Sequence, residues 1–205
     1  PVMNEDFQKP VLKEEKEGRA VSQQEVMDWV QALALSVLLV VMTFVFLVRL
    51  TGVQGSSMVE TLQDGDRLVV VSDWLCNYKA GDIVIAYKDS FYSKPIVKRI
   101  IAVAGQTVDI DFDQGIVYVD GEALEEEYVH TPTNRSEGTT FPLTLKEGQV
   151  FLMGDNRNGS SDSRNPALGA VDTGYLLGKA VFLVFPGKGE EYSGQRDFSR
   201  MGFLH

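Results

Sequence analysis

Uncharged, mostly apolar residues run from Trp29 to Val48, "WVQALALSVLLVVMTFVFLV", between Asp28 and Arg49. Twenty helical residues span roughly 30 Å, which is the thickness of the hydrocarbon core of a bilayer. The pattern therefore predicts a transmembrane anchor over residues 29–48. The run is too long for the apolar region of a cleavable signal, and no clear small-residue cleavage site follows it.

Residues 1–28 are polar, mixed in charge and poor in aromatic residues, a composition typical of a flexible tail. Ser22, with Glu25 three residues later, marks the start of the helix. Four basic residues precede the span and Arg49 follows it directly, an asymmetry that mildly favours a cytoplasmic N-terminus. We expect a single-pass membrane protein with residues 50–205 on the extracytoplasmic side.

Beyond Leu50 the apolar residues form short runs rich in β-branched and aromatic side chains, the pattern of strands. These runs are 66–72, 81–87, 94–104, 107–121, 149–154 and 179–185, and Gly, Asp and Asn turn residues separate them. No long amphipathic helix is evident after the span. The pattern predicts a mainly β domain, a sandwich or a partly open barrel.

Residues 106–147 are richer in charge and in turn residues than the segments around them, which indicates a small β insertion. Its sequence includes "EEEY" and "TPTNRSEGTT". The three adjacent acidic residues Glu125, Glu126 and Glu127 are most simply a solvated loop, and we assign them no chemistry.

Composition excludes several kinds of function. Hydrophobic residues make up 44% and charged residues 23% of the 205 residues, enough apolar material for a core. The net charge of -10 argues against a nucleic-acid partner, because phosphate binding requires a basic face. Cys76 is the only cysteine and cannot form an internal disulfide. Since His130 and His205 are the only histidines and no Cys/His cluster exists, we expect no catalytic metal and no cofactor.

Three segments carry candidate chemistry: "GSSMVETL" (55–62), "KRIIAVAGQ" (98–106) and "GDNRNGSSDSR" (154–164). A serine hydroxyl needs a base to become a nucleophile, and with histidine scarce a lysine amine is the next candidate. An ammonium with its ordinary pKa of ~10.4 accepts no proton at neutral pH, so such a lysine must be desolvated. Lys98 fits, because "PIV" precedes it and "IIAVA" follows Arg99. The alternative is a surface lysine whose stem packs on apolar neighbours.

Together, and in this order behind an N-terminal span, the three segments resemble those of bacterial type I signal peptidases. That family consists of membrane-anchored serine proteases that use a Ser-Lys dyad. The resemblance extends from the span to about Phe185 and is most specific in the "GDNR", "S" and "DSR" of the third segment. It implies a serine endopeptidase of the bacterial cell membrane that removes signal peptides from exported preproteins, cutting after small residues of the Ala-x-Ala type.

The resemblance also implies roles for single residues. Ser57, the serine directly before methionine, would be the nucleophile rather than Ser56, and Lys98 would be the general base. The Ser57 backbone N–H would donate in the oxyanion hole. Gly55 stands where some family members have a serine that adds a second donor, so that donor is unassigned.

The third segment would support this pair. By resemblance, Ser160 would hydrogen-bond the lysine amine and orient it, while Asp162 and Arg164 would form a structural ion pair. Residues 155–157 would order the loop without touching the substrate.

Two departures from the family pattern affect local geometry. The chain has Met58-Val59-Glu60-Thr61-Leu62 where the family usually has Met-x-Pro-Thr-Leu, and the segment after Arg164 is slightly longer. Glu60 allows two interpretations. Its carboxylate points into solvent and the loop only loses the stiffness of proline, or it approaches Lys98 and raises the pKa of that amine.

Other functions remain open. A Ser-Lys peptidase could process a narrow set of proteins, such as a pilin or a secreted precursor. A membrane-anchored binding module could retain the fold without activity, although Ser57, Lys98 and Ser160 are all present. Self-cleaving repressors share the Ser-Lys chemistry, but they carry a DNA-binding region where this chain has a membrane span.

Overall fold

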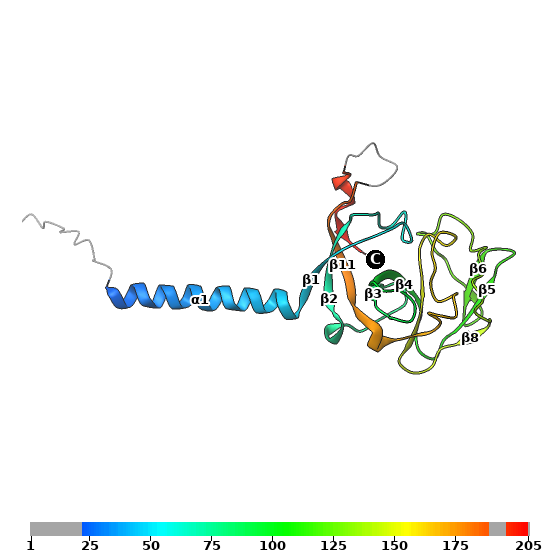
Figure 1. Cartoon of the computed structure of the whole chain (residues 1–205), viewed down its shortest axis with the longest axis horizontal. Helices are drawn as coiled ribbons and strands as arrows, with labels where there is room; N and C mark the ends of the chain where they lie inside the picture. The colour runs from blue at the N-terminus through cyan, green and yellow to red at the C-terminus, as the bar shows by residue number, and fades with distance from the viewer. Residues whose placement is uncertain (1–21, 189–195, 205) are drawn as a thin grey trace, which may run out of the picture. The chain divides into compact units, whose positions relative to one another are not determined.

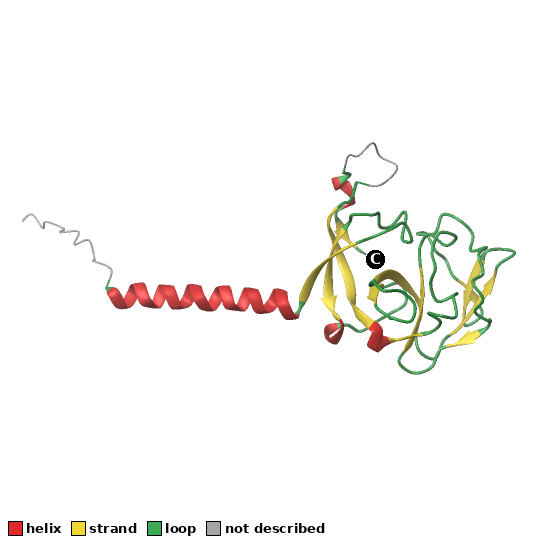
Figure 2. Ribbon diagram, viewed as in Figure 1, coloured by secondary structure: helices red, strands yellow, loops and turns green. Residues whose placement is uncertain are grey.

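The computed structural model describes residues 22–188 and 196–204, so residues 1–21 of the predicted tail lie outside the described residues. The described residues divide into two units, and the boundary along the chain lies between Val41 and Met42. Figure 1 shows the elements in chain order, and Figure 2 shows one long helix followed by strands and loops.

Helix α1 (Gln23–Phe46) begins as the sequence predicts. The Ser22 hydroxyl accepts the Glu25 N–H at 3.1 Å, and the Glu25 carboxylate accepts the Ser22 N–H at 2.9 Å, a reciprocal pair that satisfies two otherwise unbonded N–H groups. An 18-residue stretch of α1 has a mean hydropathy of 2.3, so the helix is long and apolar enough to cross a membrane. It ends at Phe46, and Val48, the last residue of the predicted span, already pairs with Val71 as part of a strand.

The larger sheet is antiparallel and contains eight strands. Its order is β1-β2-β11-β3-β4-β9-β10, and β12 pairs separately with β11. The strands are β1 (Val48–Gly52), β2 (Arg67–Ser72), β3 (Ile83–Ala86), β4 (Ile96–Ala102), β9 (Gln149–Met153), β10 (Val171–Asp172), β11 (Leu176–Phe185) and β12 (Gly202–Phe203).

A second antiparallel sheet, in the order β7-β6-β5-β8, forms the insertion. Its strands are β5 (Thr107–Asp111), β6 (Ile116–Val119), β7 (Glu122–Ala123) and β8 (Leu143–Thr144). After α1 the described residues contain only short 3₁₀ helices, η1 (Asp73–Leu75), η2 (Thr173–Tyr175) and η3 (Phe198–Arg200). The predicted fold class, an apolar helix followed by a mainly β domain with a small β insertion, is confirmed.

Strand β4 lies between buried apolar clusters and carries the candidate base. Val84 of β3 pairs directly with Lys98, and both Val84 and Ile100 belong to one cluster. Because side chains alternate along a strand, Ile96, Lys98 and Ile100 lie on the same face. The candidate lysine therefore projects from a strand position between two apolar neighbours.

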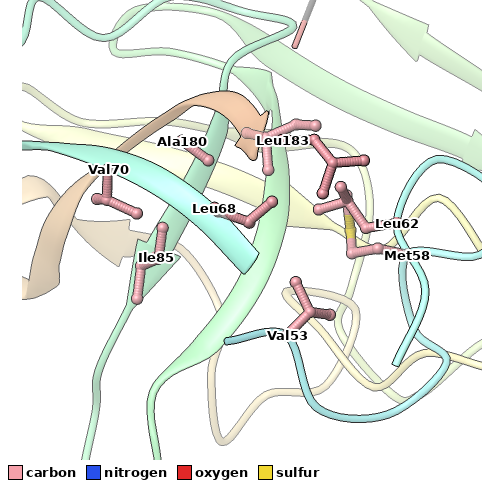
Figure 3. Close-up of a cluster of buried hydrophobic side chains, with 9 residues drawn as sticks. Val53, Met58, Leu62, Leu68, Val70, Ile85, Ala180 and Leu183 are labelled. Carbon is pink, nitrogen blue, oxygen red and sulfur yellow. The ribbon is translucent and has the colours of Figure 1, made fainter. Parts of the chain in front are cut away.

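The loop that holds Ser57 is attached to another cluster of the core. Met58 and Leu62, which are 1% and 0% exposed, pack with Val53, Leu68 and other residues of β2, β3 and β11, as Figure 3 shows. Burial of these side chains fixes the loop at both ends of the Ser57 turn. The insertion is joined to β4 and β9 through a cluster that includes Val108, Phe151 and Met153.

A buried carboxylate ties the end of this loop to the C-terminal segment. Asp66 is 0% exposed and accepts the Gln63 N–H at 2.8 Å and the Gly187 N–H at 2.6 Å. Its two oxygens also accept Arg200 guanidinium N–H groups at 3.1 and 2.8 Å. One side chain thus satisfies donors from three separate parts of the chain.

We predict that Asp66→Ala lowers the free energy of unfolding by about 3 kcal/mol, because two backbone N–H groups and an arginine lose their acceptor. The measurement is chemical denaturation of the detergent-solubilised chain. Asp113→Ala is the control, since Asp113 is exposed and, among the residues that the structure describes, its carboxylate accepts no hydrogen bond. Equal midpoints for the two variants would contradict the prediction.

Candidate active site

Ser57 lies in a tight turn after β1. Gly55 enters this turn with φ +86°, a conformation that favours glycine, and its N–H donates to Asp64 Oδ1 at 2.8 Å. The turn is closed by hydrogen bonds from Val59 N–H to Ser56 O at 3.2 Å and from Leu62 N–H to Met58 O at 2.8 Å. The burial of Met58 holds the neighbouring Ser57 in place.

The structure brings Ser57 and Lys98 together although 41 residues separate them. Lys98 Nζ lies 2.7 Å from Ser57 Oγ, within hydrogen-bond distance. Lys98 is 3% exposed, so the alternative of a surface lysine does not hold. Ser57 is half-buried, whereas Ser56 is exposed.

Burial lowers the pKa of the Lys98 amine from its ordinary value of 10.5 to about 8. Nearby charges modify this effect: Asp162, Asp155 and Glu137 raise the pKa and Arg164 lowers it. A carboxylate stabilises an ammonium and a guanidinium destabilises it, so the signs follow from the charges. At neutral pH much more of this amine is therefore free base than in a lysine with the ordinary pKa of 10.5.

The third segment folds into a buried polar loop beside this pair. The Asp162 carboxylate accepts Arg164 Nε–H and Nη2–H groups at 2.8 Å each, and both side chains are 0% exposed. Asp162 also accepts the Gly154 N–H at 2.9 Å and the Ser160 hydroxyl at 2.9 Å. The predicted contact between Asp162 and Arg164 is present, and it is part of a larger network around one carboxylate.

Ser160 lies in the same network, but its hydrogen bond differs from the expected one. Its hydroxyl donates to Asp162 rather than to Lys98, and within residues 22–188 and 196–204 no hydrogen bond joins Ser160 to Lys98. Gly154 explains how the segments approach so closely. A Cβ atom at Gly154 would collide with Ser160 Oγ and with the Ser57 carbonyl oxygen. Only glycine leaves room for both serines at this point.

Arg99, the residue after Lys98, joins β4 to the third segment. Its guanidinium makes two hydrogen bonds to the Asp155 carboxylate, at 2.9 and 2.8 Å, and a third to Gly81 O at 2.8 Å. Asp155 also accepts the Thr61 hydroxyl at 2.6 Å. This buried network links the nucleophile turn, the lysine strand and the third segment, and the sequence alone did not indicate it.

Asn156 contacts the nucleophile turn directly. Its backbone N–H donates to Ser57 O at 3.1 Å and its side-chain amide donates to Ser56 O at 3.1 Å. In the described part of the chain the Ser57 N–H has no hydrogen-bond partner. That N–H is thus free to donate to another group.

The acidic run 125–127 is not simply solvated, so that expectation is wrong for one residue. The Glu126 side chain is 10% exposed and pairs with Arg157, which is 0% exposed, through hydrogen bonds of 2.6 and 2.5 Å. Glu137 was also missed: its side chain is 5% exposed and accepts the Ser161 hydroxyl and the Asp162 N–H. Both contacts cross more than twenty residues of sequence, and no local pattern signals them.

The second interpretation of Glu60 is not supported. Glu60 Oε2 lies 3.5 Å from His130 Nε2, and both side chains are about 60% exposed, at 63% and 59%. The carboxylate is therefore at the surface and paired with histidine rather than with Lys98. The Val59–Glu60 peptide bond is cis.

A groove of about 360 Å³ opens beside Ser57 and Lys98. Residues 51, 52, 54 and 55 line one part of it and residues 94–97 line another, with Tyr92 and Ile85 completing the wall. An adjoining pocket of about 270 Å³ shares Ser57 and Lys98 and extends to Gly159 and Ser161. In the described residues no group of three His, Cys, Asp or Glu side chains is placed to hold a metal ion.

A half-buried hydroxyl lies 2.7 Å from a desolvated amine on the wall of a groove, a geometry in which an amine could take the proton of a hydroxyl. Residues 26–185 match the family model described as "Signal peptidase, peptidase S26". The chain belongs to this family, and the membership indicates a peptidase.

The relatives include signal peptidase I from Bacillus licheniformis, 36% identical over 78% of this chain and 88% of the relative. Signal peptidase I T from Bacillus subtilis (strain 168) is 35% identical over 78% of this chain and 86% of the relative. A crystal structure of signal peptidase I from Enterococcus faecalis V583 is 26% identical, with a TM-score of 0.41, and covers 51% of this chain and 97% of that chain.

Because folding lowers the pKa of Lys98, the neutral amine is favoured in the folded state and protonation opposes folding. The loss of folding stability caused by the buried ammonium is complete below about pH 8, and it disappears as the pH rises toward 10.5, the pKa of the lysine in the unfolded chain. A fall from 10.5 to about 8, at 1.36 kcal/mol per pH unit, amounts to about 3 kcal/mol. We predict that Lys98→Met is about 2 kcal/mol more stable than the wild type at pH 7, after allowing for the lost hydrogen bond to Ser57.

This gain should shrink as the pH is raised from 7 toward 10, which denaturant titrations at several pH values would measure. Lys146→Met serves as the control, because Lys146 is exposed and should show no such pH dependence. A Lys98→Met gain that stays constant with pH would contradict the desolvation of the amine.

Proposed function

We propose that this chain is a single-pass membrane-bound serine endopeptidase that removes N-terminal signal peptides from exported preproteins, with Ser57 as nucleophile and Lys98 as general base. The observation that carries the proposal is the 2.7 Å contact between Ser57 Oγ and Lys98 Nζ in a chain of the signal peptidase family. The signal-peptide substrate class follows from the family and from the curated relatives named signal peptidase I.

In the proposed acylation step, the neutral Lys98 amine takes the proton of the Ser57 hydroxyl as Oγ attacks the scissile carbonyl. The carbonyl oxygen becomes negatively charged, and the Ser57 N–H, which has no hydrogen-bond partner in the described residues, would donate to it. The Lys98 ammonium then gives its proton to the leaving amine of the mature protein. The signal peptide remains as an ester on Ser57 Oγ.

Deacylation reverses the roles of the same two groups. The regenerated Lys98 amine takes a proton from a water molecule, and the resulting hydroxide attacks the ester carbonyl. The ammonium returns the proton to Ser57 Oγ as the ester breaks, releasing the signal peptide with a free carboxylate. Among the groups of this chain, only Ser57 and Lys98 have to change their protonation state.

The groove supports an extended substrate. Its walls contain Thr51 and Gly52 at the end of β1 and Ile96 and Val97 at the start of β4, so a peptide in β conformation has strand backbone beside it. We propose that small side chains near the scissile bond, of the Ala-x-Ala type, fit shallow sites on this wall. Bulky side chains would move the carbonyl away from Ser57, and a displacement of about 1 Å can lower the rate a hundredfold.

Ser160, Asp162 and Arg164 are proposed to support the pair rather than to react. Asp162 holds the Ser160 hydroxyl and the Gly154 N–H, and Gly154 contacts the Ser57 carbonyl. Arg164 compensates the buried charge of Asp162. Ser160 would thus influence Lys98 through the loop that it orders.

Helix α1 is proposed as the membrane anchor, in agreement with its length and apolar composition. Signal-peptide cleavage sites emerge on the outer face of the membrane, so the peptidase domain would lie outside and the N-terminus in the cytoplasm. The bacterial relatives favour the bacterial cell membrane.

The test is cleavage of a purified preprotein by the detergent-solubilised chain, followed by gel electrophoresis and N-terminal sequencing of the product. We predict that Ser57→Ala and Lys98→Ala each lower kcat by at least about 10³-fold, because the two groups act as one unit. Ser160→Ala should be slowed less, through a misplaced lysine. A preprotein whose Ala-x-Ala site carries bulky residues should remain uncut by the wild type.

Ser56→Ala is the matched control, since Ser56 is the adjacent exposed serine. It should retain activity, and thermal unfolding should show that all four variants are folded. An inactive Ser56→Ala beside an active Ser57→Ala would overturn the assignment of the nucleophile.

A further inference from the structure

Three residues within a five-residue stretch of the insertion contact the three segments that carry the proposed catalytic and supporting groups. We call residues 126–130 the clasp segment. Glu126 pairs with Arg157 of the third segment, Tyr128 lies against Arg99 beside Lys98, and His130 pairs with Glu60 of the nucleophile turn. One short stretch of the smaller sheet's connecting chain therefore meets every part of the site.

The contact with Arg157 has two charge-assisted hydrogen bonds. Both Glu126 oxygens accept guanidinium N–H groups, at 2.6 and 2.5 Å, in the two-pronged geometry that suits arginine and carboxylate. Thr133, also in the insertion, accepts a further N–H at 3.0 Å. The Arg157 Nε–H donates to Gly154 O at 3.2 Å, so this pair leads directly to the glycine beside Ser57 and Ser160.

The second contact holds the arginine next to the candidate base. The Arg99 guanidinium carbon lies 3.9 Å from the centroid of the Tyr128 ring, which places the cation over the ring face. Arg99 is 1% exposed and donates at the same time to Asp155. The Tyr128 hydroxyl donates to Glu126 Oε1 at 2.9 Å, so the two contacts of the clasp segment are joined to each other.

The third contact is weaker. His130 and Glu60 are both more than half exposed and 3.5 Å apart, so solvent screens their interaction. It places the end of the clasp segment beside the nucleophile turn, while Glu126 and Tyr128 supply the buried contacts.

We propose that Glu126 and Tyr128 are positioning residues, which hold Arg157 and Arg99 so that Ser57 and Lys98 stay within reacting distance. This inference rests on the proposed roles of Ser57 and Lys98. Without Glu126, Arg157 would be a buried cation with no carboxylate partner, and its loop would have to shift to find solvent. Without the Tyr128 ring, Arg99 would lose the group that covers one of its faces, and β4 would hold Lys98 less firmly.

The charges around Lys98 determine whether its pKa rises or falls when Glu126 is replaced. Asp162, Asp155 and Arg164 of the third segment and Glu137 of the insertion act on the amine, and Arg99 follows it in β4. Neutralising Glu126 leaves the positive charge of Arg157 without its carboxylate partner, in the same segment as Asp155, Asp162 and Arg164. An added positive charge disfavours the ammonium, so the pKa of Lys98 would fall.

The first test compares Glu126→Gln with Glu125→Gln, which removes the same charge from an exposed neighbour. The full chain in detergent is assayed on a synthetic peptide with an Ala-x-Ala site, and kcat and KM are measured from pH 6 to pH 10. For Glu126→Gln we expect kcat to fall about tenfold, the scale of one charge-assisted hydrogen bond, with KM changed less than about twofold. The rising limb of kcat/KM should move to lower pH, whereas the Glu125→Gln profile should superimpose on the wild type.

A second pair of variants keeps the proposal testable if Glu126→Gln does not fold. Tyr128→Phe retains the ring over Arg99 and loses only the hydroxyl, whereas Tyr128→Leu loses the ring. We expect Tyr128→Leu to have a kcat about fivefold below that of Tyr128→Phe, in line with a desolvated cation–π contact. Thermal unfolding establishes which variants are folded at the assay temperature.

A folded Glu126→Gln enzyme with wild-type kcat and an unmoved rising limb would overturn the proposal, and so would equal kcat values for the two Tyr128 variants. Ser57→Ala in the same assay separates this failure from that of the proposed function. If Ser57→Ala cleaves the peptide, the catalytic assignment itself is wrong. If Ser57→Ala does not cleave the peptide, a Glu126→Gln enzyme with unchanged kcat and pH profile refutes only the proposed role of the clasp segment.

Discussion

The rest of the site depends on one constraint, the burial of the Lys98 amine 2.7 Å from the Ser57 hydroxyl. A charged ammonium is unfavourable among apolar side chains, and this lowers its pKa until a free base is available near neutral pH. Strand β4 supplies the surroundings, since Ile96 and Ile100 flank the lysine on the same face and Val84 lies opposite. Burial of Lys98 therefore lowers the stability of the fold, and it also provides a base that is not a histidine.

The buried charged side chains near this amine form ion pairs of opposite charge. Asp162 is paired with Arg164 and Asp155 with Arg99, while Glu126 is paired with Arg157. Each pair would be costly if one partner were removed, because an uncompensated charge would remain in the interior. The pairs fix the nucleophile turn, β4 and the third segment relative to one another, and the insertion contributes to the same network.

The sequence predicted those parts of the protein that depend on local patterns. The pattern of apolar residues predicted the membrane-length helix and the strands. The apolar neighbours of Lys98 and the resemblance to the family predicted that Lys98 lies next to Ser57. The contacts that the sequence did not predict join residues far apart in the chain, and no local sequence pattern indicates them. Glu126 is one of three identical residues, and only tertiary structure distinguishes the one that meets Arg157. The Ser160 hydroxyl donates to Asp162 instead of Lys98, and the Glu60 carboxylate lies beside His130. Both contacts depend on how the loops pack in three dimensions, which the local sequence does not specify.

The most direct test of the account is a pH titration of the lysine amines by ¹⁵N nuclear magnetic resonance. The chain would be labelled at lysine Nζ, and the Lys98 signal would be assigned as the one missing from Lys98→Met. The account predicts that this amine titrates near pH 8, where burial places the pKa of Lys98, and that an exposed lysine titrates near ~10.4. A Lys98 signal that titrates together with the exposed lysines would contradict it, because the amine would then be protonated at neutral pH and unable to take the serine proton.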